Sequence, residues 1–381
     1  MKNIAQIHVN HFVLKWARES LGLNSSKACE SIGIGAHRLD VLEKGEKEPT
    51  LDELKAMSKA YKRTIATLLL NAPPKEKPLP PDRRTVNSKD LDKFHEKTIL
   101  AVRKARALAQ SLIELNREAG FKISRFQYKA LMENKAANVA KHFRKELRLD
   151  ELREIKNINP ALEGYIEKIE SLGIAVFQLS LTQDKLRGFS IVDEVLPIIV
   201  IKRGGEPPTA KIFSLFHEFG HIILNEGGLC DLSENTKQEI EMWCNAFAAE
   251  LLIPSSELMQ TEIVSGYKSN GKVWSKADLI NLGNYFHVGP LAILRSLLDN
   301  DLTTSKYYQE KHDKWNKPSF GKAKVPEGRN IPKEIIKEKG RNYLTLAFNA
   351  FDQNRIDLKD LSDFLGVKFS YIPRTRKLLN V

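Results

Sequence analysis

The feature that most constrains the fold is a pair of histidines in an apolar segment. The sequence FSLFHEFGHIILNEGG, residues 213–228, places His217 and His221 four residues apart, with Glu218 beside the first. Such a segment is expected to lie in the protein interior. Burying a polar group there costs free energy unless the group is hydrogen-bonded, paired or bound to a metal. The pattern therefore indicates either a satisfied buried cluster or a working site.

The segment is expected to form one helix of about four turns, because nothing interrupts it before Asn225 and two glycines come after it. Residues four apart on a helix point the same way, so His217 and His221 can ligate one ion. The H-E-x-x-H arrangement is typical of zinc sites in which the glutamate takes a proton from water on the metal. We therefore expect Zn²⁺ as cofactor, both histidines as metal ligands, and Glu218 as the catalytic residue.

A catalytic zinc site needs a third protein ligand, and no third histidine follows at a suitable spacing. A second helical stretch, QEIEMWCNAFAAELLIP at residues 238–254, carries three glutamates. Glu241 borders the apolar face that must pack against the first helix, whereas Glu239 leans toward solvent. We expect Glu241 to be the third ligand. The alternatives are a structural or degenerate metal site, and two core histidines hydrogen-bonded to their neighbours.

Composition sets broad limits on the chain. Its 381 residues are enough for two or three domains, and 42% hydrophobic with 28% charged residues is ordinary for a soluble protein. The formal charge of +12 favours anionic partners only weakly. Three scattered cysteines do not make a disulfide framework, and no apolar run approaches the roughly 20 residues that span a bilayer. These features predict a cytoplasmic protein without a membrane partner.

Short amphipathic stretches over residues 10–70 predict a helix, a tight turn at residues 33–35 and a second helix. Through ESIGIGAHRLDVLEKGEKEPTLDELKAMSKAY, residues 30–61, this module resembles a phage-repressor-type (Xre-like) helix-turn-helix domain of five helices. The resemblance implies the fold of this module but does not identify the partner that the module binds.

Two partners are open for this module. If it binds double-stranded DNA, residues 35–44 form the recognition helix and face the major groove through three side chains, His37, Arg38 and Lys44. If it docks a protein, the acidic residues on the same helix are easier to explain, because Asp40 and Glu43 would lie badly beside phosphates. We lean toward protein docking.

The remaining chain alternates helical patterns with a short region of strands. A stretch with five prolines, residues 71–88, is typical of an extended linker, and a long helical pattern comes next at 91–116. Residues 174–202 are rich in Val, Ile and Phe with turn residues between them, which predicts two or three strands. Helix, turn and helix recur at 275–302 and at 340–367.

The motif segments also resemble a known family. IFSLFHEFGHIIL followed by EIEMWCNAFAAELLIP looks like the ImmA/IrrE metallopeptidases, whose pattern is H-E-x-x-H and then E-x-x-A-N-x-F-A-A-x-L-L-x-P. The match places Glu241 on the third ligand of the family and Asn245 on its asparagine, while Cys244 replaces the usual alanine. Xre-like modules ahead of this core are a known arrangement, so the likeness covers most of the chain.

The resemblance implies a mainly α, α+β fold in four parts. These are an Xre-like helix-turn-helix domain (1–72), a proline-rich linker (73–90), a zincin-like, gluzincin-type peptidase core with a small sheet (91–265), and helical extensions that resemble helix-turn-helix modules (266–381). The exposed positions of the extensions at 275–302 and 340–367 mix both charges, so we expect them to brace the cleft and contact a protein rather than DNA. His287 is expected to be a surface residue, the alternative being a hydrogen bond to the transition state.

The predicted function is a zinc-dependent endopeptidase that selectively cleaves a regulatory protein, such as a helix-turn-helix repressor or an antitoxin-like regulator. The alternative is a DNA-binding transcriptional regulator whose peptidase-like domain is only a sensor or scaffold. A role in a toxin–antitoxin or phage-defence system is compatible with either.

The linker yields a first prediction. Few contacts are expected to cross a proline-rich segment, so limited proteolysis of the full chain should cut between Asn71 and Ser88 and release the first module. The fragments can be identified by mass spectrometry. Primary cleavage within residues 91–116 would contradict the boundary.

Overall fold

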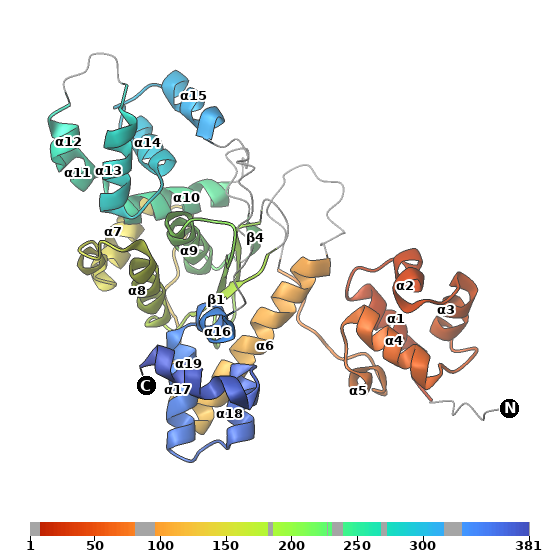
Figure 1. Ribbon diagram of the computed structural model, residues 1–381. Helices are drawn as coiled ribbons and strands as arrows, with labels where there is room; N and C mark the ends of the chain where they lie inside the picture. The colour runs from red at the N-terminus through yellow and green to blue at the C-terminus, as the bar shows by residue number, and fades with distance from the viewer. Residues whose placement is uncertain are drawn as a thin grey trace. The chain divides into compact units, whose positions relative to one another are not determined.

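The protein is described by a computed structural model that is mainly α-helical with one small sheet (Figure 1). The described residues fall into two compact units. The first unit runs to residue 79 and includes the beginning of helix α6 (Glu96–Glu118), up to Arg103. The second unit holds the rest of α6, from Lys104, and all later elements of the chain. None of the described helices combines the length and apolarity that crossing a bilayer requires. The structure describes residues 8–80, 96–181, 186–226, 228–230, 239–267, 273–315 and 330–380. Of the predicted linker at 73–90, residues 81–90 lie outside the described ones.

The first unit contains the five predicted helices. They are α1 (His11–Glu19), α2 (Ser25–Ile32), α3 (Ala36–Glu43), α4 (Leu51–Tyr61) and α5 (Ile65–Leu68). Leu14, Leu54 and Tyr61 are fully buried between them. The turn between α2 and α3 falls at Gly33, whose φ of 82° ends α2 in the left-handed conformation. The predicted helix-turn-helix arrangement is confirmed.

The second unit begins with the rest of α6 (Glu96–Glu118). Helices then alternate with the sheet: α7 (Ala136–Glu146), the 3₁₀ helix η1 (Leu149–Leu152), α8 (Ile158–Glu170), α9 (Pro208–Ile223) and α10 (Glu239–Leu252). Shorter helices come next: α11 (Ser255–Gln260), α12 (Glu262–Ser265), α13 (Lys276–Phe286), α14 (Pro290–Asp299) and α15 (Ser305–Trp315). The last group is α16 (Ile331–Lys339), α17 (Arg341–Asp352), α18 (Leu358–Leu365), η2 (Phe369–Tyr371) and α19 (Ile372–Leu379).

The sheet has four strands in the order β1-β3-β2-β4. Their bounds are β1 (Ala175–Leu179), β2 (Gly188–Ile191), β3 (Ile198–Lys202) and β4 (Gly228–Cys230). β1 runs parallel to β3, and β2 runs antiparallel to both β3 and β4, so that Phe189 pairs with Val200 on one side and Leu229 on the other. β1, β2 and β3 lie in the region 174–202, where two or three strands were predicted. β4 was not predicted, because the glycines at positions 227 and 228 are typical of a helix stop.

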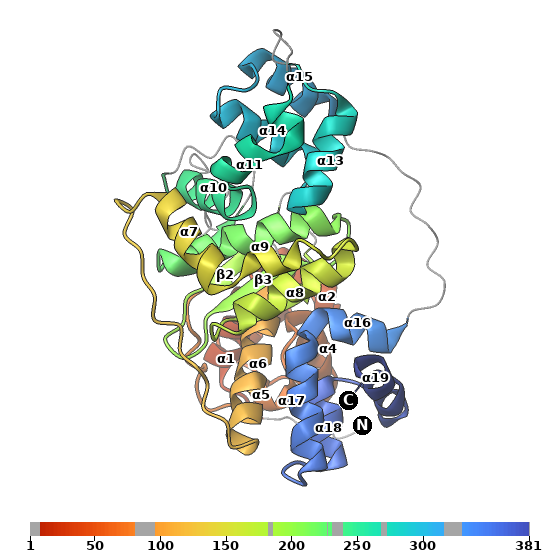
Figure 2. The same ribbon diagram turned by 90° about the vertical axis from the view of Figure 1, so that its left-hand side faces the viewer.

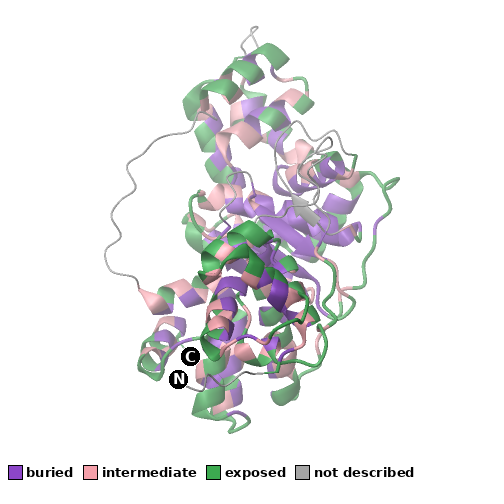
Figure 3. Ribbon diagram, turned by 90° about the vertical axis from the view of Figure 1, so that its right-hand side faces the viewer, coloured by how far each residue is buried: buried purple, intermediate pink, exposed green. Residues whose placement is uncertain are grey.

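α9 lies against the sheet on one side and against α10 on another. Contacts with β2, β3, α8 and α10 surround it, which explains why its sequence is apolar on nearly every face. In Figure 3 the buried colour covers nearly all of β1, β2 and β3 and most of α9. One apolar cluster joins α9 and α10 to residues of α13 and α14, including Leu279, Phe286 and Ile293.

The two later helical groups lie on different sides of this core, α11–α15 on one and α16–α19 on another (Figure 2). The predicted helix-turn-helix patterns correspond to α13 with α14 and to α17 with α18. The expectation that His287 is a surface residue is wrong, because its side chain is only 3% exposed. It ends α13, and its ring lies 3.2 Å from the Tyr165 hydroxyl and 3.0 Å from the Ile155 carbonyl oxygen. Burial lowers its pKa.

Candidate metal centre

The site begins with an unusually close approach of α9 and α10. A Cβ atom on Gly220 would lie 3.1 Å from Sγ and 3.3 Å from Cα of Cys244, which is closer than ordinary van der Waals contact. Only glycine allows α10 to come this near without displacement of one helix. The sequence signal for this contact was the small residues on both helices. The close crossing sets the distance from the α9 histidines to the acidic residues of α10.

Three side chains converge where the helices cross. His217 and His221 of α9 and Glu241 of α10 are each fully buried. Nε2 of His217 lies 3.1 Å from Oε2 of Glu241, and Nε2 of His221 lies 3.3 Å from Oε1 of the same carboxylate. The two Nε2 atoms are 3.2 Å apart. Within the part of the chain that the structure describes, this is the one group of three such side chains whose donor atoms could hold a metal.

The donor set fits a zinc ion. Ligand atoms about 2.0–2.1 Å from a tetrahedral zinc ion lie about 3.3 Å from one another. The two Nε2 atoms are 3.2 Å apart, and they lie 3.1 Å and 3.3 Å from the two different oxygens of the Glu241 carboxylate, so that one atom from each residue lies within 4.8 Å of the other two. Two imidazoles and one carboxylate are also a ligand set found in catalytic zinc sites. Glu239, which we expected to lean toward solvent, is exposed at the start of α10, whereas Glu241 lies with the histidines.

The charge state of Glu241 suits a metal ligand. Burial by itself raises the pKa of this carboxyl, but hydrogen bonds and charge interactions with His217 and His221 outweigh it and hold the pKa at about 2. Glu241 is therefore a carboxylate at neutral pH. A metal binds the deprotonated form of such a ligand, so no proton has to leave this group first.

Glu218 lies on the same helix, with its side chain 1% exposed. It packs against β2, where a Cβ atom on Gly188 would lie 3.0 Å from Oε1 and 3.2 Å from Cγ of Glu218. Gly188 therefore leaves the space that the glutamate occupies. Sequence reasoning missed this contact, because it depends on which strand lies beside α9 and no local pattern encodes that choice.

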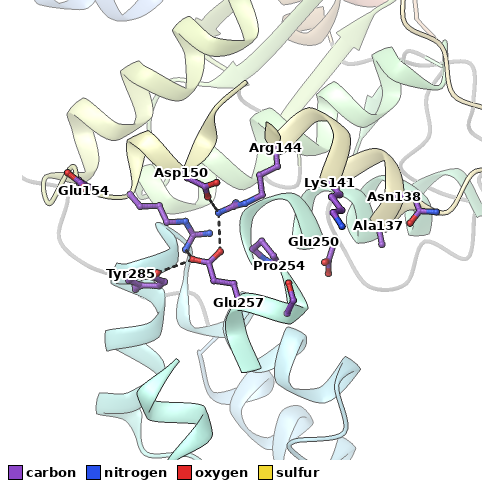
Figure 4. A pocket seen from close by; sticks show the side chains of 12 residues that line it. Ala137, Asn138, Lys141, Arg144, Asp150, Glu154, Glu250, Pro254, Glu257 and Tyr285 are labelled. Carbon is purple, nitrogen blue, oxygen red and sulfur yellow. Dashed lines mark hydrogen bonds and ion pairs between the residues drawn. The ribbon is translucent and has the colours of Figure 1, made fainter. Parts of the chain in front are cut away.

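Two arginines hold the other end of α10. Arg144 and Arg153 donate to the carbonyl groups of the last two α10 residues, at 2.8 Å and 3.0 Å. Both also pair with Glu257 of α11, at 3.0 Å and 2.9 Å, and the Tyr285 hydroxyl of α13 donates to the same carboxylate at 3.0 Å (Figure 4). Cations at a helix C-terminus interact favourably with the helix dipole. The cluster lines an open pocket of about 980 Å³ and ties α11 and α13 to the helix that carries Glu241.

Arg38, predicted to face DNA, is engaged within the first unit. Its guanidinium forms two bonds of 2.8 Å to Glu53 of α4 and a third of 3.0 Å to the carbonyl of Glu48. The hydrogen bond from Arg38 is the main reason that the pKa of Glu53 is lowered to about 2. The guanidinium therefore links α3 to α4 in this structure.

The other two predicted DNA contacts remain on the surface. His37 is exposed on α3, and Lys44 directly follows that helix. Lys44 pairs with Asp40 at 2.7 Å, and both side chains are more than half exposed, at 59% and 56%. The pair leaves this face of α3 close to neutral. DNA contact through α3 stays a prediction.

Comparison with known families agrees with the geometry. Residues 169–298 match the Peptidase_M78 family model, described as the IrrE N-terminal-like domain. Residues 14–68 match the helix-turn-helix family model. No curated protein and no solved structure matches the chain. The first match covers β1 to β4, α9, α10 and the helices through most of α14, and the second covers α2 to α5 and most of α1.

Arg38→Ala should weaken the first unit. Loss of the Arg38–Glu53 contact should destabilise the unit by about 1 kcal/mol, because the bonds are bidentate and partly buried. The pKa of Glu53 is about 2 in the folded state against an ordinary 4.5, so this stabilisation is present above about pH 4.5 and is lost as the pH falls through 2. Hydrogen exchange of α3 and α4 peptides at several pH values measures both effects.

The matched control is Lys44→Ala, which removes an exposed ion pair of small expected contribution. Equal protection of α3 and α4 in Arg38→Ala and Lys44→Ala would contradict the structural role of Arg38.

Gly220→Ala should disturb the metal centre, although Gly220 is not one of the three proposed ligands. The added methyl group would meet Cys244 and force α10 away from α9, which should lower stability by about 1–3 kcal/mol and weaken zinc binding at least about tenfold. Gly204→Ala is the control, because a Cβ atom there meets no atom within 4 Å. Zinc titration with a competing chelator measures the affinity. Equal zinc affinity in the two variants would show that the close crossing does not position the ligands.

Proposed function

Because the chain carries a helix-turn-helix domain followed by an IrrE N-terminal-like domain, we propose that it is a zinc-dependent endopeptidase that cleaves a regulatory protein. The observation that carries this proposal is the buried cluster of His217, His221 and Glu241, with Glu218 beside it on α9. A buried carboxylate and two buried imidazoles would be expensive to maintain in an apolar core without a task.

Each residue of the cluster has a separate role in this proposal. His217 and His221 would hold the metal through their imidazoles, and Glu241 would hold it through its carboxylate. A zinc ion held there supplies Lewis acidity, which activates water near neutral pH and polarises a peptide carbonyl. Burial of the ligands keeps them in low dielectric, where their interaction with a cation is strong.

Glu218 is the proposed general base. Its carboxylate accepts a proton from the attacking water and delivers that proton to the nitrogen of the scissile bond. A C–O bond forms, the C–N bond breaks, and the products are a carboxylate and an amine. Gly188 supports this role, because its missing side chain leaves the Glu218 carboxylate its place beside β2.

A regulatory substrate fits the domain organisation better than general digestion does. A second domain raises the effective concentration of one partner near the active site and adds specificity that a peptidase cleft alone lacks. We propose a helix-turn-helix repressor or an antitoxin-like regulator as the substrate. Such proteins act on DNA in the cytoplasm, which is where we place the enzyme.

A second candidate function is favoured by the helix-turn-helix match. In this alternative the chain regulates transcription by binding DNA, and the metal centre is a sensor or scaffold without turnover. The two candidates differ at Glu218, which hydrolysis requires and a metal-sensing scaffold does not.

The proposal predicts that variants of the metal ligands and a variant of the general base differ in zinc binding. His217→Ala, His221→Ala and Glu241→Ala should each lose tight zinc binding, because each removes a donor atom, whereas Glu218→Ala should keep the metal. Metal analysis of the purified full chain measures this. Glu239→Ala is the matched control on α10, and zinc loss there with full occupancy in Glu241→Ala would make our choice of ligand wrong.

Cleavage tests the enzyme assignment itself. Candidate repressors are co-expressed with the wild-type chain or with Glu218→Ala, and their fragments are identified by mass spectrometry. We expect one defined cut with the wild type and a loss of at least about 10²-fold in its rate with the zinc-loaded variant. Identical fragments from both chains would point to another protease, and zinc-loaded chains that cut none of the candidates would favour the regulator alternative.

A further inference from the structure

The last three helical elements of the chain form a second helix-turn-helix outside the matched regions. α18 ends at Leu365, residues 366–368 make a turn, and η2 leads directly into α19, so that residues 369–379 form one helical segment. Leu361 and Leu365 of α18 are buried, as are Ile372 and Leu379 of α19. α17 contacts both helices. α19 also packs against α16. Two helical segments that are joined by a short turn and both contact a third helix have the order of elements found in DNA-binding helix-turn-helix modules.

The last helix is basic and free of acidic residues. From Phe364 to Asn380 the chain has four basic residues and no Asp or Glu; the basic residues are Lys368, Arg374, Arg376 and Lys377. The mixed charges that led us to expect protein contact lie in the extensions at 275–302 and 340–367. All four of these basic residues come after residue 367. The structure shows that the stretch belongs to the same module as α17 and α18.

Three of the four cations are exposed to solvent. Buried positions 372, 375 and 379 turn one side of α19 to the core, which leaves Arg374 and Lys377 exposed on another side, and Lys368 is exposed just before η2. Among the described residues none of these three forms an ion pair or a side-chain hydrogen bond. Arg376 differs, because it pairs with Asp352 at 2.6 Å and lies over the Phe348 ring.

The acidic residues of the module are largely used elsewhere. Asp352 is paired with Arg376. Asp357 and Asp360 form the capping box that starts α18. Asp363 is exposed, and it lies on α18 rather than on the segment formed by η2 and α19. All charged residues of the segment formed by η2 and α19 are basic, in contrast to the face of α3, where Lys44 is paired with Asp40.

Exposed side chains suited to base contact lie at the start of the same segment. Phe369 is 53% exposed, and Ser370 and Pro373 are exposed beside it. The N-terminal residues of a recognition helix are the ones that reach base edges, where an aromatic ring can contact a thymine methyl group and a serine hydroxyl can hydrogen-bond. Figure 2 shows α19 at the outer edge of the α16–α19 group, not enclosed by its neighbours.

From these observations we propose that the α18–α19 helix-turn-helix binds duplex DNA, with Lys368, Arg374 and Lys377 on phosphates and Phe369 and Ser370 toward the bases. An acidic protein surface would also suit the charge. DNA is the favoured partner, because exposed cations that can bind phosphates lie beside exposed side chains that can contact bases. The proposal concerns a binding site apart from the peptidase centre, so it does not depend on hydrolysis.

The test measures binding of the full chain to a labelled duplex of random sequence by fluorescence anisotropy, over a series of salt concentrations. The triple variant Lys368→Ala/Arg374→Ala/Lys377→Ala should bind at least about tenfold more weakly near 0.1 M salt. Each lost phosphate contact should reduce the slope of log K against log salt by about 0.9, so the total reduction should be about 2–3.

Two further variants make the result specific. Lys129→Ala/Lys145→Ala/Lys156→Ala removes the same charge from exposed positions elsewhere in the second unit and should keep affinity within about twofold of the parent. His37→Ala/Lys44→Ala tests whether α3 carries the binding instead. Circular dichroism and thermal unfolding should be unchanged in the α19 triple variant, because all three side chains are exposed.

The proposal is overturned if the α19 triple variant and the charge-matched control bind the duplex with the same affinity and salt slope. It is equally overturned if the parent chain shows no salt-dependent duplex binding, which would leave the basic face to an acidic protein. Selective loss in the α19 triple variant supports the proposal whether or not α3 also contributes.

Discussion

The second unit depends on a buried carboxylate lying between two buried imidazoles. Glu241 is fully buried and remains charged, so it must be compensated within the core, and His217 and His221 are the groups that compensate it. The compensation requires α10 to approach α9 as closely as Gly220 and Cys244 permit. The same requirement explains why a polar motif lies in an apolar helix: the apolar residues hold α9 in place, and the polar ones face the crossing.

α10 is held at both ends, and this fixes the position of Glu241 relative to the two histidines. Near its start it presents Glu241 to the histidines, and at its end Arg144 and Arg153 bind the last carbonyl groups and pair with Glu257. The arginine cluster also connects α10 to α13 through Tyr285. The helices after the core are thus part of what positions the metal ligand, and a change in this cluster would reach the site along α10.

Local sequence patterns predicted that His217, His221 and Glu241 lie together, but they did not predict the surroundings of this cluster. The histidine spacing and the apolar face of the second helix pointed to Glu241 rather than Glu239, because both features reflect contacts within four residues or between two neighbouring helices. The contact of Gly188 with Glu218 could not be predicted, because it depends on strand pairing. The burial of His287 and the pairing of Arg38 with Glu53 likewise arise between distant or separate elements.

X-ray absorption at the zinc edge of the zinc-loaded full chain tests the central claim most directly, because it reports the ligand atoms without requiring a substrate. We predict nitrogen and oxygen scatterers at about 2.0–2.1 Å, with the multiple-scattering signature of two imidazoles and no sulfur scatterer. A sulfur scatterer at about 2.3 Å, or a spectrum without the imidazole signature, would contradict a centre built from His217, His221 and Glu241.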